Sequence, residues 1–145
     1  MKVVSKGLAE QVLDLVEETA EKVGASMPVR FEELTADVGE LPRIMLQLSE
    51  SDSQQQRYLS GERICPMPFA LTLRISADDQ QTRLDARELL GRMADAILED
   101  CMVLNGYVAY ALPTASVPVC LGKAPLFEDW QVTFDLKYKQ SKRKG

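Results

Sequence analysis

Two stretches in which apolar and polar residues alternate strictly predict the central strands of the fold. In the first stretch the apolar residues share one face and the small or polar residues share the other: Phe69, Leu71, Leu73 and Ile75 against Ala70, Thr72 and Arg74. In the second stretch the apolar face carries Trp130, Val132, Phe134, Leu136 and Tyr138. A period of two is typical of strands that are covered on one side only. We therefore expect residues 57–75 to form a strand, a turn at Ser60-Gly61 and a longer strand, and residues 126–139 to form the last strand.

Weaker alternation predicts three shorter strands, over residues 29–33, 43–48 and 116–121. Pro28 precedes the first and Pro118 interrupts the third, and proline is tolerated at strand starts, at bulges and on sheet edges. Pro66 and Pro68 lie two residues apart, so both missing amides point to the same side of their strand. We expect the strand to bend, or to lack a neighbour, on that side.

A spacing of three and four residues predicts two amphipathic helices. The first is expected to begin with Ser5 as its cap and to stop at Gly24, with an apolar stripe of Leu8, Val12, Leu15, Val16, Thr19 and Val23. Its acidic residues diverge along the helix, which favours a solvated face over a metal site: Glu10, Asp14, Glu17, Glu18 and Glu21. The second helix is expected to begin at Asp78, with Gln81 completing a capping box, and its stripe is Ala86, Leu90, Met93, Ala94, Ile97, Leu98 and Cys101. Asn105-Gly106 predicts the turn that follows it.

Together these elements predict an α+β fold in a single domain, residues 1–145. We expect a mixed, largely antiparallel sheet of about four to six strands that packs against the two helices. Hydrophobic residues make up 46% of the chain and charged residues 27%, which is typical of a globular protein. The sequence has no apolar run of the roughly 20 residues that span a membrane, and no signal-peptide pattern, so we expect no membrane partner and a cytoplasmic start.

The net charge of the chain disfavours one class of partner, nucleic acid. A net charge of -5 disfavours a nucleic-acid-binding role for the whole surface. The exception is a basic segment that consists of Lys137, Lys139, Lys142, Arg143 and Lys144. Two interpretations remain open for it: a solvated tail that keeps the last strand soluble, or a contact to nucleic acid or to an acidic partner.

Candidate chemistry is sparse. The chain has no histidine, no glycine-rich phosphate loop and no metal-ligand spacing. Its three cysteines, Cys65, Cys101 and Cys120, are expected to be small core residues. Glu128 and Asp129 point to opposite faces of a strand, so they are poorly placed to share a proton or a metal, and we expect both to be exposed. We assign no catalytic, cofactor-binding or metal residues, and we expect the protein not to be an enzyme.

Five local strings, in this order, resemble phage minor capsid proteins of the tail-terminator-like kind. The strings are MPVRFEE (27–33), LPRIML (41–46), RYLSG (57–61), MPFAL (67–71) and WQVTFDLKY (130–138). The resemblance covers residues 27–139. It departs from the family at Leu59 and Ser60, where the family usually has Ile-Asp in a turn before a Pro-Phe strand. The match at this turn is therefore one of pattern rather than identity.

The resemblance implies a subunit that assembles into a ring, commonly a hexamer, at the head-tail junction of a bacteriophage or prophage. Such a ring terminates the tail tube, contacts the tail tube protein and the head connector proteins, and lets DNA pass through its bore without sequence-specific binding. The protein would then be assembled in the host bacterial cytoplasm and reside in the virion. On the motif shared with the family, Arg57, Tyr58 and Arg63 are the candidate partner-binding residues.

Three other interpretations stay open at this point. A neck or tail-completion protein of the same machinery would have a similar fold. A small hydrolase or transferase would need a concave pocket that gathers carboxylates, or a cysteine with a base. A nucleic-acid-binding adaptor would need the basic segment to join a wider positive surface.

Overall fold

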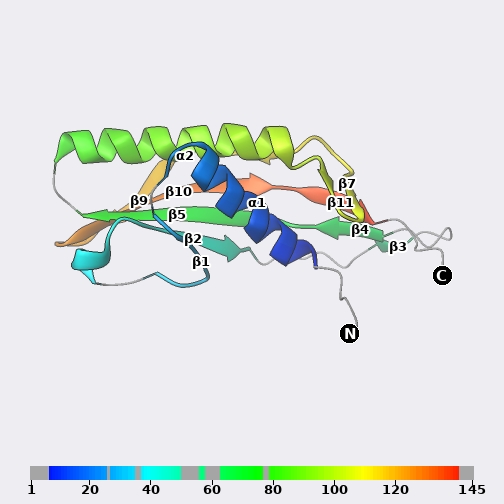
Figure 1. Cartoon of the computed structure of the whole chain (residues 1–145), viewed down its shortest axis with the longest axis horizontal. Helices are drawn as coiled ribbons and strands as arrows, with labels where there is room; N and C mark the ends of the chain where they lie inside the picture. The colour runs from blue at the N-terminus through cyan, green and yellow to red at the C-terminus, as the bar shows by residue number, and fades with distance from the viewer. Residues whose placement is uncertain are drawn as a thin grey trace.

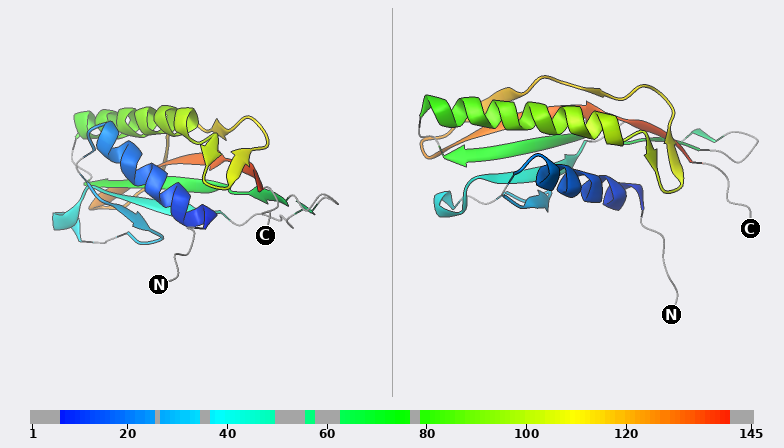
Figure 2. Two further views of the ribbon diagram at one scale, coloured as in Figure 1. Left: turned by 45° about the vertical axis from the view of Figure 1, so that its right-hand side comes forward. Right: turned by 45° about the horizontal axis from the view of Figure 1, so that its top comes forward.

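A computed structural model describes residues 7–25, 27–34, 37–49, 56–57, 63–76 and 79–140. Both helices lie on one face of the strands, with α2 along the sheet and α1 crossing in front (Figures 1 and 2). The elements in chain order are α1 (Leu8–Lys22), β1 (Val29–Phe31), the 3-10 helix η1 (Val38–Glu40), β2 (Arg43–Leu48), β3 (Gln56–Arg57), β4 (Arg63–Pro66), β5 (Phe69–Ser76), α2 (Gln80–Asp100), β6 (Val103–Leu104), β7 (Tyr107–Ala109), β8 (Thr114–Ala115), β9 (Val119–Lys123), β10 (Phe127–Asp135) and β11 (Lys137–Gln140).

The strands form a six-stranded sheet in the order β1-β2-β5-β10-β8, with β9 also on β10, and a five-stranded sheet in the order β3-β4-β11-β7-β6. Among the described strands, β1 and β2 pair in parallel and all other pairs are antiparallel. The predicted α+β fold is therefore confirmed. The second sheet was not predicted. It forms because the chain on either side of the β5–β10 pair continues lengthwise beyond the first sheet, as β4 and β11.

The two sheets share one central two-stranded ribbon. β5 pairs with β10 from Ser76↔Phe127 to Phe69↔Phe134, and β4 pairs with β11 from Pro66↔Lys137 to Arg63↔Gln140, without a change of register. At the junction the backbone N–H of Met67 donates to the carbonyl of Leu136 at 2.7 Å. The central ribbon (β4–β5 with β10–β11) is thus the scaffold on which all other strands are placed.

The two prolines of the central ribbon face the side on which β2 ends. The carbonyl of Pro68 accepts a hydrogen bond from the N–H of Ser49 at 2.9 Å, just after β2. Since Pro66 and Pro68 point the same way, their missing amides lie where the neighbouring strand changes from β2 to β3. Residues 50–55, which connect β2 to β3, lie outside the described residues, so the expected bend or missing neighbour stays a prediction.

The helices cover the apolar face that alternation predicted. Phe69 and Phe134 lie opposite each other across the ribbon and stack, with their ring centroids 4.5 Å apart. Burial of large apolar side chains of this kind stabilises a fold by roughly 1.5 to 3 kcal/mol each. The buried set joins both helices to the sheet: Val12, Val16, Ile44, Leu46, Leu71, Leu73, Leu90, Met93, Ile97, Val132, Leu136 and Tyr138.

The helix ends differ in part from the predictions. The carboxylate of Asp79, rather than that of Asp78, caps α2 by accepting hydrogen bonds from Thr82 N–H at 2.8 Å and Thr82 Oγ1 at 2.9 Å. Asp78 itself lies outside the described residues. The expected capping box involves the backbone of Asp78, so it too lies outside the described residues; the side-chain amide of Gln81 donates to Asp85 Oδ1 at 2.9 Å.

The first helix begins at Leu8, directly after Gly7. The predicted cap Ser5 is outside the described residues. Gly24 follows the helix end with φ +83°, a left-handed conformation that glycine adopts without strain, so the predicted stop is confirmed.

The segment after α2 contains the predicted turn. The Asn105-Gly106 turn, with Gly106 at φ +85°, joins β6 and β7 into a hairpin. The predicted strand over residues 116–121 was wrong in its bounds, because Pro118 separates two short strands, β8 and β9. The predicted turn at Ser60-Gly61 lies outside the described residues.

Candidate functional site

Two of the three predicted partner-binding residues, Arg57 and Arg63, lie on paired strands at one end of the central ribbon. Arg63 begins β4, and its partners are Arg57 in β3 and Gln140 in β11. Tyr58 lies outside the described residues, and of Arg57 only the backbone is described. The structure thus places Arg57 and Arg63 on paired strands, and their role in binding a partner stays a prediction.

The acidic pair Glu128-Asp129 in β10 bonds to arginines of neighbouring elements. Glu128 is fully buried, which contradicts the expected exposure, and it accepts a hydrogen bond from Arg83 Nε of α2 at 2.7 Å. Its other oxygen has no hydrogen-bond partner among the described residues. The physical reason for its burial is that the helix face of β10 is covered by α2, which supplies the cation.

Asp129 points to the opposite face of the sheet, as predicted. Its two oxygens accept hydrogen bonds from the guanidinium of Arg74, the residue directly across in β5, at 2.8 and 2.9 Å. The same guanidinium lies 4.0 Å from the centre of the Phe127 ring. Asp129 is only partly exposed as a result, so its expected exposure was also wrong. The ion pair between Asp129 and Arg74 therefore fastens β10 to β5.

Two of the three cysteines are core residues, as predicted. Burial raises the pKa of both Cys65 and Cys101. Cys120 is exposed, which contradicts the prediction, because β9 lies at the edge of the sheet. The buried hydroxyl of Tyr138 donates to the carbonyl of Cys101 at 2.7 Å, and burial raises the pKa of this tyrosine.

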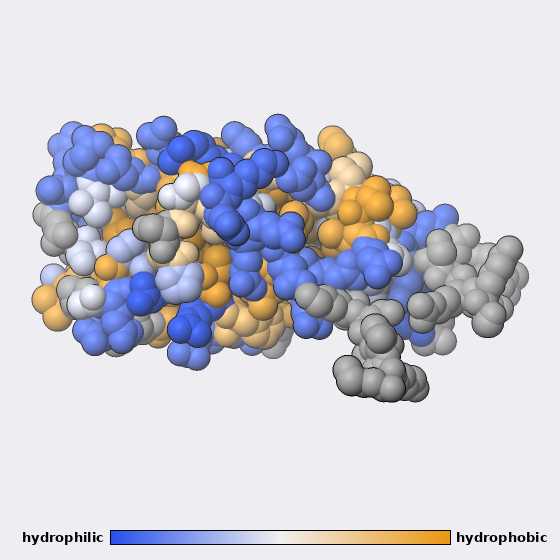
Figure 3. All heavy atoms as spheres, in the orientation of Figure 1, coloured by the Kyte–Doolittle hydropathy of each residue, from blue (hydrophilic) through white to orange (hydrophobic). Residues whose placement is uncertain are grey.

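An exposed apolar surface follows a segment of the chain that carries no charge. Residues 102–122 contain no aspartate, glutamate, lysine or arginine, although 27% of the chain is charged. We call this segment the uncharged edge; it includes β6 to β8 and nearly all of β9. Eight of its large apolar side chains are exposed: Met102, Val103, Val108, Tyr110, Leu112, Val117, Val119 and Leu121. Figure 3 shows apolar surface gathered at the end of the molecule where the β6–β7 hairpin lies.

Such an edge is unusual for a strand that faces only water. Exposed edge strands are commonly protected by charged side chains, which prevent pairing with other chains. Contiguous exposed apolar surface marks sites where a protein contacts another molecule. The uncharged edge was missed in the sequence, although its signal was there as a long run without charge.

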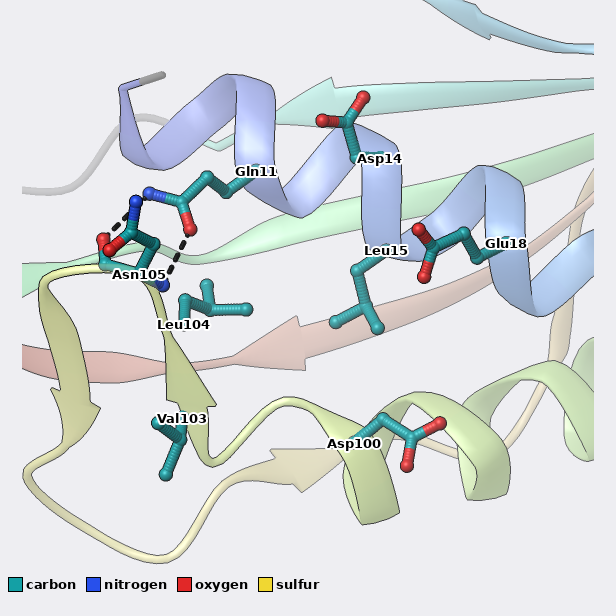
Figure 4. Close-up of a pocket in the computed structure, with 8 residues that line it drawn as sticks. All are labelled: Gln11, Asp14, Leu15, Glu18, Asp100, Val103, Leu104 and Asn105. Carbon is teal, nitrogen blue, oxygen red and sulfur yellow. Dashed lines mark hydrogen bonds between the residues drawn. The ribbon is translucent and has the colours of Figure 1, made fainter. Parts of the chain in front are cut away.

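A groove lies between α1 and the β6–β7 hairpin, with a volume of about 400 Å³. The side-chain amide of Gln11 holds the hairpin turn by two hydrogen bonds to the backbone of Asn105, donating to its carbonyl at 2.9 Å and accepting from its N–H at 2.8 Å (Figure 4). The groove is lined by Gln11, Asp14, Leu15, Glu18, Asp100, Val103, Leu104 and Asn105. No sequence pattern predicted it, because its walls come from segments 94 residues apart.

Among the described residues, no group of three or more cysteine, aspartate or glutamate side chains is placed to hold a metal ion. Neither of the described helices has a stretch long and apolar enough to cross a membrane. No protein-family model matches the chain, and no curated protein matches it.

Proposed function

We propose that this chain is a structural assembly protein of a bacteriophage or prophage. Its copies form a ring at the head-tail junction, which terminates the tail tube and joins it to the head. The partners are other copies of the chain, the tail tube protein and the head connector proteins. The observation that carries the proposal is the uncharged edge, whose eight large apolar side chains are exposed in the part of the subunit that the structure describes.

The arrangement of the sheet supports assembly from copies. The six-stranded sheet has β1 at one edge and β8 with β9 at the other, so the two edges differ in length and chemistry. A contact made by one edge with a different surface of the next copy is heterologous, and it closes into a ring when the rotation between copies closes. Edge strands are also the usual place where chains add to one another.

The resemblance to tail-terminator-like proteins supports the phage role. Four of its five strings fall on strands that are adjacent in the sheet, namely β1, β2, β5 and β10, the last continuing into β11. These strands make up the framework of the subunit. The uncharged edge lies outside all five strings, so it supports assembly independently of the resemblance.

Electron microscopy of the purified protein mixed with its tail tube tests the proposal. The matched variants are Leu121→Lys in the uncharged edge and Leu84→Lys on α2, because the two leucines have similar exposure, 55% and 52%. We expect rings at the tube ends with the unmodified chain and with Leu84→Lys, and none with Leu121→Lys. Tube ends that stay bare with the unmodified chain would contradict the phage role.

A further inference from the structure

The groove between α1 and the β6–β7 hairpin combines an apolar floor with a rim of carboxylates. Leu15 and Leu104 form the floor, and Val103 beside them is 68% exposed. Figure 4 shows Glu18 on α1 and Asp100 on α2 on opposite walls. Lysine and arginine side chains suit such a surface, because their aliphatic stems pack on apolar groups while their charged ends reach a polar rim.

Two segments of the chain carry opposite charge, and we call α1 with the groove beside it the acidic pole and the residues after β11 the basic pole. Helix α1 carries five carboxylates and a single cation, Lys22, which pairs with Asp100 at 3.2 Å. Residues 136–145 hold the basic segment, with five cations and no acidic side chain. The groove lies in the acidic pole, so the basic segment is complementary to it in charge. Lys137 and Lys139 are held in β11, so the cations that can reach another copy are Lys142, Arg143 and Lys144. We infer that the groove binds residues 141–145 of a neighbouring copy, an inference that rests on the proposed assembly from copies.

The strand order favours a neighbouring copy over the same chain as the source of this segment. β11 ends at Gln140, which pairs with Tyr107 of β7, and β7 lies between β11 and β6, whose Val103 and Leu104 line the groove. Two strand spacings amount to about 10 Å, which is the length of about three extended residues. A chain that reached its own groove would therefore need about three residues, 141–143, to span the distance across the hairpin. The segment of a neighbour is free of this constraint.

The contact gives the assembly a direction. It joins the acidic pole of one copy to the basic pole of the next, so each copy contributes one groove and one basic segment. Such a heterologous contact repeats around an axis, as a ring requires. It also makes the contact sensitive to salt, because exposed charge pairs are screened at high ionic strength.

The test uses two charge-reversed variants of the full chain. The groove-reversed variant carries Glu18→Lys and Asp100→Lys, and the tail-reversed variant carries Lys142→Glu, Arg143→Glu and Lys144→Glu. A control with Glu88→Lys and Asp95→Lys changes two exposed carboxylates of α2 outside the groove, with the same change in net charge as the groove-reversed variant. Fluorescence anisotropy follows the binding of a labelled peptide of residues 140–145, which leaves out the core residues of β11, to each.

We expect the peptide to bind the unmodified chain and the control, and to bind the groove-reversed variant at least about tenfold more weakly, since each exposed ion pair contributes a few-fold to affinity. Rising salt should weaken the binding. Equal binding to the control and the groove-reversed variant would overturn the inference.

Sedimentation of mixtures then separates a neighbour from the same chain. Each reversed variant alone should lose the contact, whereas an equal mixture should regain it, because the acidic tail of one variant meets the basic groove of the other. A mixture that associates no more than its components would overturn the inference.

If both reversed variants form rings like those of the unmodified chain, the inference fails while the proposed assembly stands. If the unmodified chain forms no ring with its tail tube but the peptide still requires the groove, the proposed function fails and the specificity of the groove stands.

Discussion

The central ribbon and the uncharged edge are both rich in apolar residues, but they use them differently. In the ribbon, Leu71, Leu73 and Phe134 are buried beneath the helices, and each has an apolar neighbour across the strand pair. In the uncharged edge, Val119 and Leu121 are exposed, and Leu112 reaches 81% exposure. Packing within the subunit explains the first pattern and leaves the second unexplained. A pattern of apolar residues therefore indicates a surface that is favourable to bury. The surface that buries it can belong to the same subunit or to another molecule.

The largest difference between the two regions should appear when the ribbon loses a core ring. Phe134 is 2% exposed and stacks on Phe69, so Phe134→Ala should lower the free energy of unfolding by about 3 to 5 kcal/mol. Urea unfolding followed by circular dichroism measures it. Leu121→Ala in the uncharged edge is the control, and an equal loss there would contradict the comparison.

The next largest effect should come from the buried carboxylate that joins α2 to the ribbon. Arg83→Ala leaves Glu128 buried without its cation, and we expect a loss of about 2 kcal/mol in the free energy of unfolding. The value lies below that of a fully buried pair because Arg83 is itself partly exposed. Replacing both residues by leucine should cost less than Arg83→Ala alone. If the double variant loses more, the account of Glu128 is wrong.

A smaller effect should appear in alkaline solution. Burial raises the pKa of Tyr138 in the folded state above the value of about 10 in the unfolded chain. Its contribution to stability is therefore complete below pH of about 10 and is lost as the pH rises from there towards the folded-state pKa. Tyr138→Phe should cost about 1 kcal/mol at neutral pH, through the hydrogen bond to Cys101.

Urea unfolding at a series of pH values from 7 to 11 checks this prediction. The unmodified chain should lose stability more steeply than Tyr138→Phe at the alkaline end of the series. A residual loss in the variant is expected, because burial also raises the pKa of Cys65 and Cys101. Parallel curves for the two proteins would show that Tyr138 does not carry the effect.

The smallest effect on the subunit should come from the uncharged edge itself. Leu121→Lys should change the free energy of unfolding by less than about 0.5 kcal/mol, because the side chain already faces solvent. The same substitution is expected to abolish rings, so stability and assembly should separate in this variant. A large loss of stability would mean that the edge belongs to the core of the subunit.

The sequence was sufficient for the ribbon because alternation reports which face of a strand is covered. Trp130 to Tyr138 and Phe69 to Ile75 therefore fell on the predicted faces. The errors arose where burial depends on distant partners. Glu128 is buried because Arg83, 45 residues away, reaches it from α2. Cys120 is exposed because the order of the strands, which no local pattern records, places β9 at an edge.

The two surfaces proposed for function differ in the same way. The uncharged edge could be found in the sequence as a run without charge. The groove could not, since it exists only because Gln11 of α1 meets the Asn105 turn of the β6–β7 hairpin. Features that follow from a local sequence pattern could be predicted from the sequence. Features that depend on contacts between distant segments could be found only in the folded structure.

Hydrogen–deuterium exchange of the dilute and the assembled protein tests most directly that the uncharged edge is a contact surface. The account predicts that assembly slows exchange in residues 102–122, while the central ribbon, already protected by its own pairing, changes little. Assembly that leaves exchange in residues 102–122 unchanged would contradict it.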